Sequence, residues 1–267
     1  MAYVKTLVAD SVVQRLIEAQ GIYQKCNRAF DSLVRAGATA VEVPNLPSLV
    51  VKTAGTIADH ADRKKTKTET TMVNVPLGKA VIPIADEILG QFESNGMLMK
   101  EFTTSAALTF QEYFDQSVVT EALTTTNTVP DFANLDWTTI TGIMKALDVA
   151  KVPKTGRIIA ISANLADDFY AIDVIKNAMA YNIEKLQTGQ FLSLLGMNFY
   201  ISALVPQATA KNQVVGFYGP AVAFILSRYM ELKSAWDGDK LLDVNDLLCH
   251  FGVKLLSTSF AVKGKES

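Results

Sequence analysis

The side chains that could perform chemistry are few and poorly placed for it. Cys26 and Cys249 lie far apart and belong to no CxxC pair, so their spacing indicates neither a disulfide framework nor a metal knuckle. His250 directly follows Cys249, and the other histidine, His60, lies in a polar stretch. Successive side chains of a strand point to opposite faces, which is a poor geometry for a Cys/His catalytic pair. We interpret both cysteines as reduced thiols.

Carboxylates are the remaining candidates for metal or acid–base chemistry. They cluster in residues 237–239 and 243–246, but the sixth position counted from Asp243 is Leu248, where the turn of a calcium loop needs glycine. We interpret both clusters as turn and strand-end residues, while a carboxylate pair acting as general acid and base stays open. The GxGxxG, GxxxxGK[ST], HExxH and GxSxG motifs are absent. The sequence therefore predicts no catalytic residue, no cofactor and no metal.

The composition disfavours a nucleic-acid reader and favours a chain that buries surface against partners. With 25 basic and 27 acidic residues, the net charge is −2, so no net positive field is available to hold DNA. Charged residues make up 19% of the chain, against about 25% in a typical soluble domain. The length of 267 residues fits one large domain or two small ones.

Two segments bear on export and membrane insertion. The N-terminus lacks the long apolar core of a secretory signal, so we expect the protein to stay where it is made. Residues 186–210 carry no charge and are long enough to cross a bilayer. Pro206 and two glycines divide this segment into short apolar runs, which favours two strands joined by a turn at Gly196.

The N-terminal third predicts an arm followed by a long excursion. Val13, Leu16 and Ile17 recur at helical spacing, typical either of a detached arm or of the first helix of a globular core. Residues 41–51 and 71–77 then predict two strands that leave the body and return. The stretch between them, residues 59–69, has almost nothing apolar to bury, so it is expected to project.

A helix over 97–123 is the clearest element, because its apolar residues step by three or four from end to end. Its opposite face is predicted to be polar and almost wholly acidic, which fits either a solvated face or a binding face. Beyond a polar linker follow a helix near 137–147, an apolar β-branched strand at 157–162, and further helices and strands up to a strand in 241–260. The predicted class is α+β.

The order of these parts resembles the major capsid protein of tailed bacteriophages, the Hong Kong 97 fold. The stretch VNVPLGK (73–79) followed by IADEIL (84–89) is similar to the family's return strand of the extended loop, running into the peripheral domain. ALDVAKVP (146–153) with GRIIAIS (156–162) resembles its helix, Val-Pro turn and strand in the axial domain. LGMNFYIS (195–202) with Val205-Pro206, and FGVK (251–254), are similar to a later axial segment and to the closing strand.

The resemblance implies a division of the chain into five parts. These are an N-terminal arm at 1–38, an extended loop (E-loop) at 39–78, a peripheral domain with the spine helix at 79–127, an axial domain at 128–240, and a C-terminal strand region at 241–267 that returns to the peripheral domain. It also implies hexamers and pentamers that form an icosahedral head around double-stranded DNA, with localisation in the virion after assembly in the host cytoplasm.

Partners follow from the same resemblance. They are other copies of the chain, a portal, possible decoration proteins and, because Met1 opens directly into the arm, a separate scaffolding protein or none. Two alternatives stay open: an encapsulin-type nanocompartment shell of the same fold, which holds cargo enzymes, and an unrelated α+β enzyme with a projecting hairpin.

One inter-subunit contact is predicted at residue level. In the family the extended loop lies over an adjacent subunit, and here its tip is basic while the spine helix is acidic. The basic residues are Arg63, Lys64, Lys65 and Lys67, and the acidic residues are Glu101, Glu112, Asp115 and Glu121.

Overall fold

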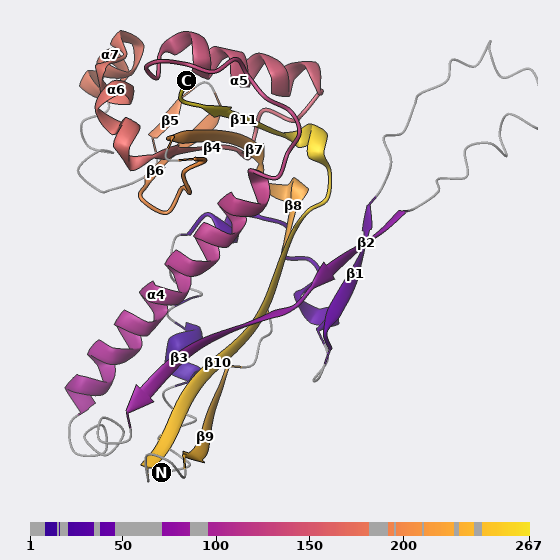
Figure 1. Ribbon diagram of the computed structural model, residues 1–267, viewed down its shortest axis with the longest axis vertical. Helices are drawn as coiled ribbons and strands as arrows, with labels where there is room; N and C mark the ends of the chain where they lie inside the picture. The colour runs from indigo at the N-terminus through magenta and orange to yellow at the C-terminus, as the bar shows by residue number, and fades with distance from the viewer. Residues whose placement is uncertain are drawn as a thin grey trace, which may run out of the picture.

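The computed structural model describes residues 9–14, 16, 21–34, 38–45, 71–85, 96–181, 192–194, 196–209, 211–226, 230–237 and 242–267. Three bodies make up this part of the chain (Figure 1). We call them the α5 unit, a five-stranded sheet with three helices; the α4 unit, a long helix over a four-stranded sheet; and the ribbon, a two-stranded sheet beside them.

The sheet of the α5 unit has the strand order β11-β7-β4-β6-β5, in which β4 and β6 are parallel and the other pairs antiparallel. Its elements are α5 (Trp137–Val149), β4 (Arg157–Ser162), α6 (Ala166–Ala171), α7 (Asp173–Tyr181), β5 (Leu192–Leu194), β6 (Met197–Ser202), β7 (Gln213–Tyr218) and β11 (Ala261–Lys265). The predicted strand at 157–162 is confirmed, as are two strands joined by a turn at Gly196, whose φ is +79°.

Strand β4 is apolar throughout because both of its faces are covered. All six of its residues are buried. Ile159 and Ile161 pack in a cluster with Ile140 and Ile143 of α5, whereas Ile158 packs in a different cluster that includes residues of α4. A strand buried on both faces reads as a continuous apolar run rather than an alternating one.

The α4 unit is organised around β10 (Leu242–Leu255), the longest strand that the structure describes. Strand β3 (Gly78–Ala85) pairs with one side of β10, and β8 (Val222–Leu226) and β9 (Glu231–Asp237) pair in succession with the other. Helix α4 (Gly96–Ala122) runs alongside this sheet and confirms the predicted long helix (Figure 1). Phe110 and Phe114 of α4 lie in one core cluster with Phe224 and Phe251 of the sheet.

Strand pairing crosses the boundaries of the predicted division of the chain at two places, while the division into arm, loop and domains stays a prediction. Residues 222–226 and 231–237, which the predicted division assigns to the axial domain at 128–240, form β8 and β9 and pair with β10. Conversely, 261–265 of the C-terminal region pair with β7 of the α5 unit rather than with the sheet of the α4 unit. The chain therefore crosses between the two units more often than a simple linear division allows. Strand β3 ends at Ala85 and so includes the first two residues of the IADEIL stretch (84–89).

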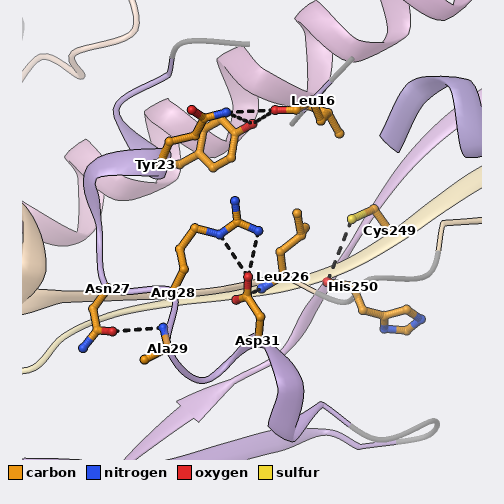
Figure 2. Close-up of polar contacts among 10 residues, drawn as sticks. Leu16, Tyr23, Asn27, Arg28, Ala29, Asp31, Leu226, Cys249 and His250 are labelled. Carbon is orange, nitrogen blue, oxygen red and sulfur yellow. Dashed lines mark hydrogen bonds and ion pairs between the residues drawn. The ribbon is translucent and has the colours of Figure 1, made fainter. Parts of the chain in front are cut away.

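The N-terminal region decides between the two alternatives for its first helix, and favours the first helix of a globular core over a detached arm. Residues 9–14 and 16 are helical, and Ala9, Val12 and Leu16 are buried in the same cluster as Phe114. Farther on, the Asp31 carboxylate binds the Arg28 side chain through one oxygen and accepts from the Leu226 N–H of β8 through the other (Figure 2). In the described residues this region is part of the subunit's own core.

The ribbon consists of β1 (Ala40–Asn45) and β2 (Thr71–Pro76), which confirms the predicted leaving and returning strands over these residues. The remainder of the first predicted strand, 46–51, and the stretch 59–69 that is expected to project lie outside the described residues. Val41, Val43 and Val75 are buried against Ala223 and Ile225 of β8, so the root of the excursion is supported by the α4 unit. Support of this kind is expected, because an isolated two-stranded ribbon is only marginally stable in water.

Candidate functional site

The outer face of α4 is the surface on which the sequence places the acidic half of the predicted contact. Glu101 and Glu112 are exposed there, as predicted. Leu108 lies between them in sequence and is 55% exposed. Residues four apart share one side of a helix, so 101, 105, 108, 109 and 112 form a single exposed strip.

Asp115 does not lie on this strip, contrary to its predicted place on the polar face that would carry the inter-subunit contact. Its exposed fraction is 1%, and its Oδ1 accepts a hydrogen bond of 2.9 Å from the Tyr23 N–H. Burial raises the pKa of this carboxyl to about 6, although hydrogen bonds from the backbone of Tyr23 and Ile22 act in the opposite direction. The N-terminal segment crosses α4 here and covers the side chain. A sequence signal was present: Val119 and Ala122, at i+4 and i+7, are apolar and buried.

Glu121 is already engaged within its own subunit. Its Oε1 accepts from the Leu255 N–H at 3.2 Å and lies 3.0 Å from Lys254 Nζ. Both partners belong to the end of β10, so Glu121 joins the last turn of α4 to that strand. Of the four predicted acidic residues, Glu101 and Glu112 are thus the pair left open on the helix. The basic residues Arg63, Lys64, Lys65 and Lys67 lie outside the described residues.

A groove of about 570 Å³ lies between the C-terminal half of α4 and the turn from β2 to β3. Leu77 and Tyr113 line it, and Phe251 and Gly252 of β10 lie among its other lining residues. Gly252 permits the close approach of the ribbon, because a Cβ at this position would lie 2.6 Å from the Pro76 carbonyl oxygen. The path of the excursion as it leaves the body is therefore set by a backbone contact.

The two units are joined beyond the C-terminal end of α4 by side chains that bind backbone carbonyls. Thr125 Oγ1 donates to the carbonyl of Thr258 or of Ala261, at 2.9 and 2.8 Å, and Asn127 Nδ2 lies within bonding distance of the same two oxygens. Lys263 Nζ of β11 donates to the Leu123 carbonyl at 3.0 Å. These groups fix α4 relative to β11, and no sequence motif marks them.

The reactive side chains are placed as structural groups. Cys26 and Cys249 are buried, and burial raises the pKa of the Cys249 thiol to about 12, far from the thiolate that a nucleophile requires. Within the described ranges no group of three or more His, Cys, Asp or Glu residues is placed to hold a metal ion. In the same ranges, no helix combines the length and apolar character needed to cross a bilayer.

Solved structures align with almost the whole chain. A chain from Mycobacterium phage Che8 is 18% identical, with a TM-score of 0.64 over 92% of this chain and 91% of that one. The virus-like particle from Pyrococcus furiosus gives 9% identity and a TM-score of 0.59 over 97% of both chains. The mature capsid of bacteriophage PhiM1 gives 12% identity and 0.52 over 86% and 82%. No protein-family model and no curated protein matches the sequence.

These likenesses establish the fold of the chain. The expected mixed α+β class and its likeness to phage capsid structures are confirmed over nearly the full length.

Proposed function

We propose that this chain is the major shell protein of a phage-type particle, in which hexamers and pentamers of one chain close an icosahedral head around double-stranded DNA. The observation that carries the proposal is the extent of the fold likeness. It spans at least 82% of both partners in each comparison, including a bacteriophage mature capsid. The shell role is proposed by analogy with these particles, because a fold by itself does not fix a function.

The parts of the fold take the roles that the family resemblance implies. Helix α4 acts as the spine of a peripheral domain, the α5 unit as the axial domain around the symmetry axes, and the ribbon as the root of the extended loop. The test is to express the chain and examine the product by electron microscopy and sedimentation. Closed particles are expected, and a stable 29.0 kDa monomer under all assembly conditions would refute the proposal.

The contact between neighbours is proposed to join the basic tip at Arg63, Lys64, Lys65 and Lys67 to Glu101 and Glu112 of the adjacent α4. Asp115 and Glu121 are not included in the proposed contact, because the first is buried and the second is bound to β10. Each exposed pair contributes only about 0–1 kcal/mol. The contact recurs at every subunit, and complementary charge guides encounter and register more than it adds affinity.

Charge reversal tests this contact. The four basic residues are changed to Glu, and particle yield is measured against salt concentration. A matched control reverses four lysines of the α5 unit that are exposed, with the same change in net charge: Lys145, Lys151, Lys154 and Lys176. We expect the tip variant alone to lose assembly at low salt, and Glu101→Lys with Glu112→Lys to restore it. Normal assembly of the tip variant would refute the pairing while leaving the shell role intact.

We propose that the shell encloses DNA without binding it tightly, because the net charge of the chain is −2. Free subunits should bind duplex DNA weakly and with a shallow dependence on salt, since few phosphates would be neutralised. Submicromolar binding with a steep salt dependence would refute this part of the proposal. Scaffolding, portal and decoration proteins and assembly in the host cytoplasm follow from the same proposal.

A shell without a genome is the second candidate. The observation that favours it is the alignment with the Pyrococcus virus-like particle over 97% of both chains. Nuclease treatment of particles purified from their natural source separates the two candidates. Protected genome-length DNA supports the phage head, and protected protein cargo without DNA supports an encapsulin-type compartment. The third alternative, an enzyme, would be supported by substrate turnover in the isolated chain, and the likeness to particle shells argues against it.

A further inference from the structure

We propose that Asp115 is a proton-controlled latch that holds residues 21–26 on α4 and opens more readily when its carboxyl is ionised. The proposal goes beyond the shell role and does not depend on it. It rests on the position of one acidic side chain where three parts of the fold meet.

The carboxyl lies between the N-terminal segment, α4 and β6. Oδ1 accepts from the Tyr23 N–H at 2.9 Å, and the Tyr200 side chain of β6 faces the same carboxyl. The Tyr23 hydroxyl donates to the Leu16 carbonyl, which binds the segment to the preceding helix (Figure 2). Gly21 allows the close approach, since a Cβ there would lie 3.0 Å from Oδ1 and 2.6 Å from the Tyr23 ring.

The ionised carboxyl is only partly compensated at this position: hydrogen bonds from the backbone of Tyr23 and Ile22 and from the Tyr200 side chain lower its pKa, and burial outweighs them. Asp115 is 1% exposed, and within the described part of the chain its Oδ2 has no hydrogen-bond partner. A buried charge without full compensation is costly, and a proton on Oδ2 removes that cost while Oδ1 can still accept from Tyr23. The titratable and charged groups around it are Tyr23, Cys26 and Arg28 of the N-terminal segment, Tyr200 of β6 and Glu112 of α4.

Arg28 does not neutralise the latch. Its guanidinium is bound to Asp31, 2.7 Å away, and its charge lowers the pKa values of Tyr23 and Cys26. The contributions to the pKa of Asp115 are burial, which raises it, and the hydrogen bonds, which lower it. Opening of residues 21–26 would expose the Asp115 carboxyl to water, and the opening equilibrium therefore depends on pH.

Linkage sets the size of the response. The pKa of Asp115 is about 6 in the closed state, and an ordinary value of 3.8 is expected once opening exposes it to water. Protons therefore favour the closed state, and the opening equilibrium should rise about tenfold from pH 5 to pH 7.5. The stabilising contribution of the latch is complete below pH 3.8 and is lost as the pH rises through about 6.

The experiment is hydrogen exchange of the full-length chain at pH 5 and pH 7.5, corrected for the intrinsic exchange rate. The amides of residues 22–26 should exchange about tenfold faster at the higher pH, while those of α6, in the other unit, should not change. Asp115→Asn should abolish the difference. The variant His60→Gln with His250→Gln removes both histidines of the chain, and as the control it should retain the difference.

Three results would overturn the latch. They are equal exchange of residues 22–26 at the two pH values, an equal pH response in Asp115→Asn, and a response lost in the histidine-free control. If Asp115→Asn does not fold, labelling of Cys26 in Cys249→Ser, normalised to free cysteine, reports the same opening. An unchanged normalised rate between pH 5 and pH 7.5 would then refute the proposal.

Discussion

Gly252→Ala is expected to disturb the packing of the ribbon against β10, because the added methyl group would collide with β2. The added Cβ would lie 2.6 Å from the Pro76 carbonyl oxygen and 3.0 Å from both Leu77 Cδ2 and Val75 Cγ1. The nearest atom belongs to the backbone of β2, so it cannot be relieved by a change of rotamer. Either β2 moves away from β10, or β10 bends.

The magnitude follows from two opposing terms. Forcing a methyl group into a filled site costs typically about 1–3 kcal/mol. Replacing glycine lowers the entropy of the unfolded chain and returns about 0.4–1 kcal/mol. The net expectation is a loss of about 1–2 kcal/mol in the free energy of unfolding, together with a tilt of the ribbon that lowers particle yield.

Gly78→Ala is the matched control at the start of β3. The atom nearest to its added Cβ is the Phe251 carbonyl oxygen at 3.9 Å, which is ordinary contact. Urea unfolding of both variants should show Gly252→Ala destabilised and Gly78→Ala unchanged or slightly stabilised. Equal stabilities, or normal particle yield with Gly252→Ala, would show that the Pro76 contact does not set the path of the ribbon.

Three further predictions concern the interior of the subunit. Phe114→Ala should lower the free energy of unfolding, measured by chemical denaturation, by about 3–5 kcal/mol, because Phe114 is fully buried and its ring contacts Tyr23, Phe224 and Phe251. A loss below about 1 kcal/mol would contradict this packing. Thr125→Val removes the hydroxyl that serves two carbonyls, so a loss of about 1–3 kcal/mol is expected, with β11 amides exchanging faster. Asp115→Asn should raise the free energy of unfolding by up to about 3 kcal/mol at pH 7.5 and change it little at pH 4. The reason is that the pKa of Asp115 is raised to about 6 in the folded state, so the wild-type fold loses stability as the pH rises and this carboxyl ionises. Thermal unfolding at both pH values checks this sign.

Local patterns were sufficient for the elements whose burial follows from neighbouring residues. The apolar steps of three and four along 97–123 predicted α4, because one side of a helix repeats at that spacing. The β-branched run at 157–162 predicted β4 residue for residue, and the absence of long uninterrupted apolar stretches around Gly196 predicted two strands. In each case the spacing of apolar residues in the sequence matches the helix or strand that forms.

The sequence could not show which of the four acidic residues of α4 are exposed to solvent. Asp115 and Glu121 were grouped with Glu101 and Glu112 as acidic residues of one helix, although at about 100° per residue Glu121 lies roughly 200° around the helix from Glu101, and Asp115 has the buried apolar residues Val119 and Ala122 at i+4 and i+7. Which of them meets solvent depends on chain segments far away: residue 23 covers Asp115, and the end of β10 binds Glu121. No local pattern reports a contact between residues 92 positions apart.

Sheet membership was likewise decided by the tertiary structure. Residues 222–226 and 213–218 are both short apolar runs a few positions apart, yet β8 pairs with β10 and β7 with β4. What separates them is the 3₁₀ turn Gly219–Ala221, which carries the chain from one unit to the other. Strand propensity specifies that a segment extends and which of its faces is apolar. Its partner is chosen by backbone hydrogen bonds and packing between distant segments, and these exist only in the folded subunit.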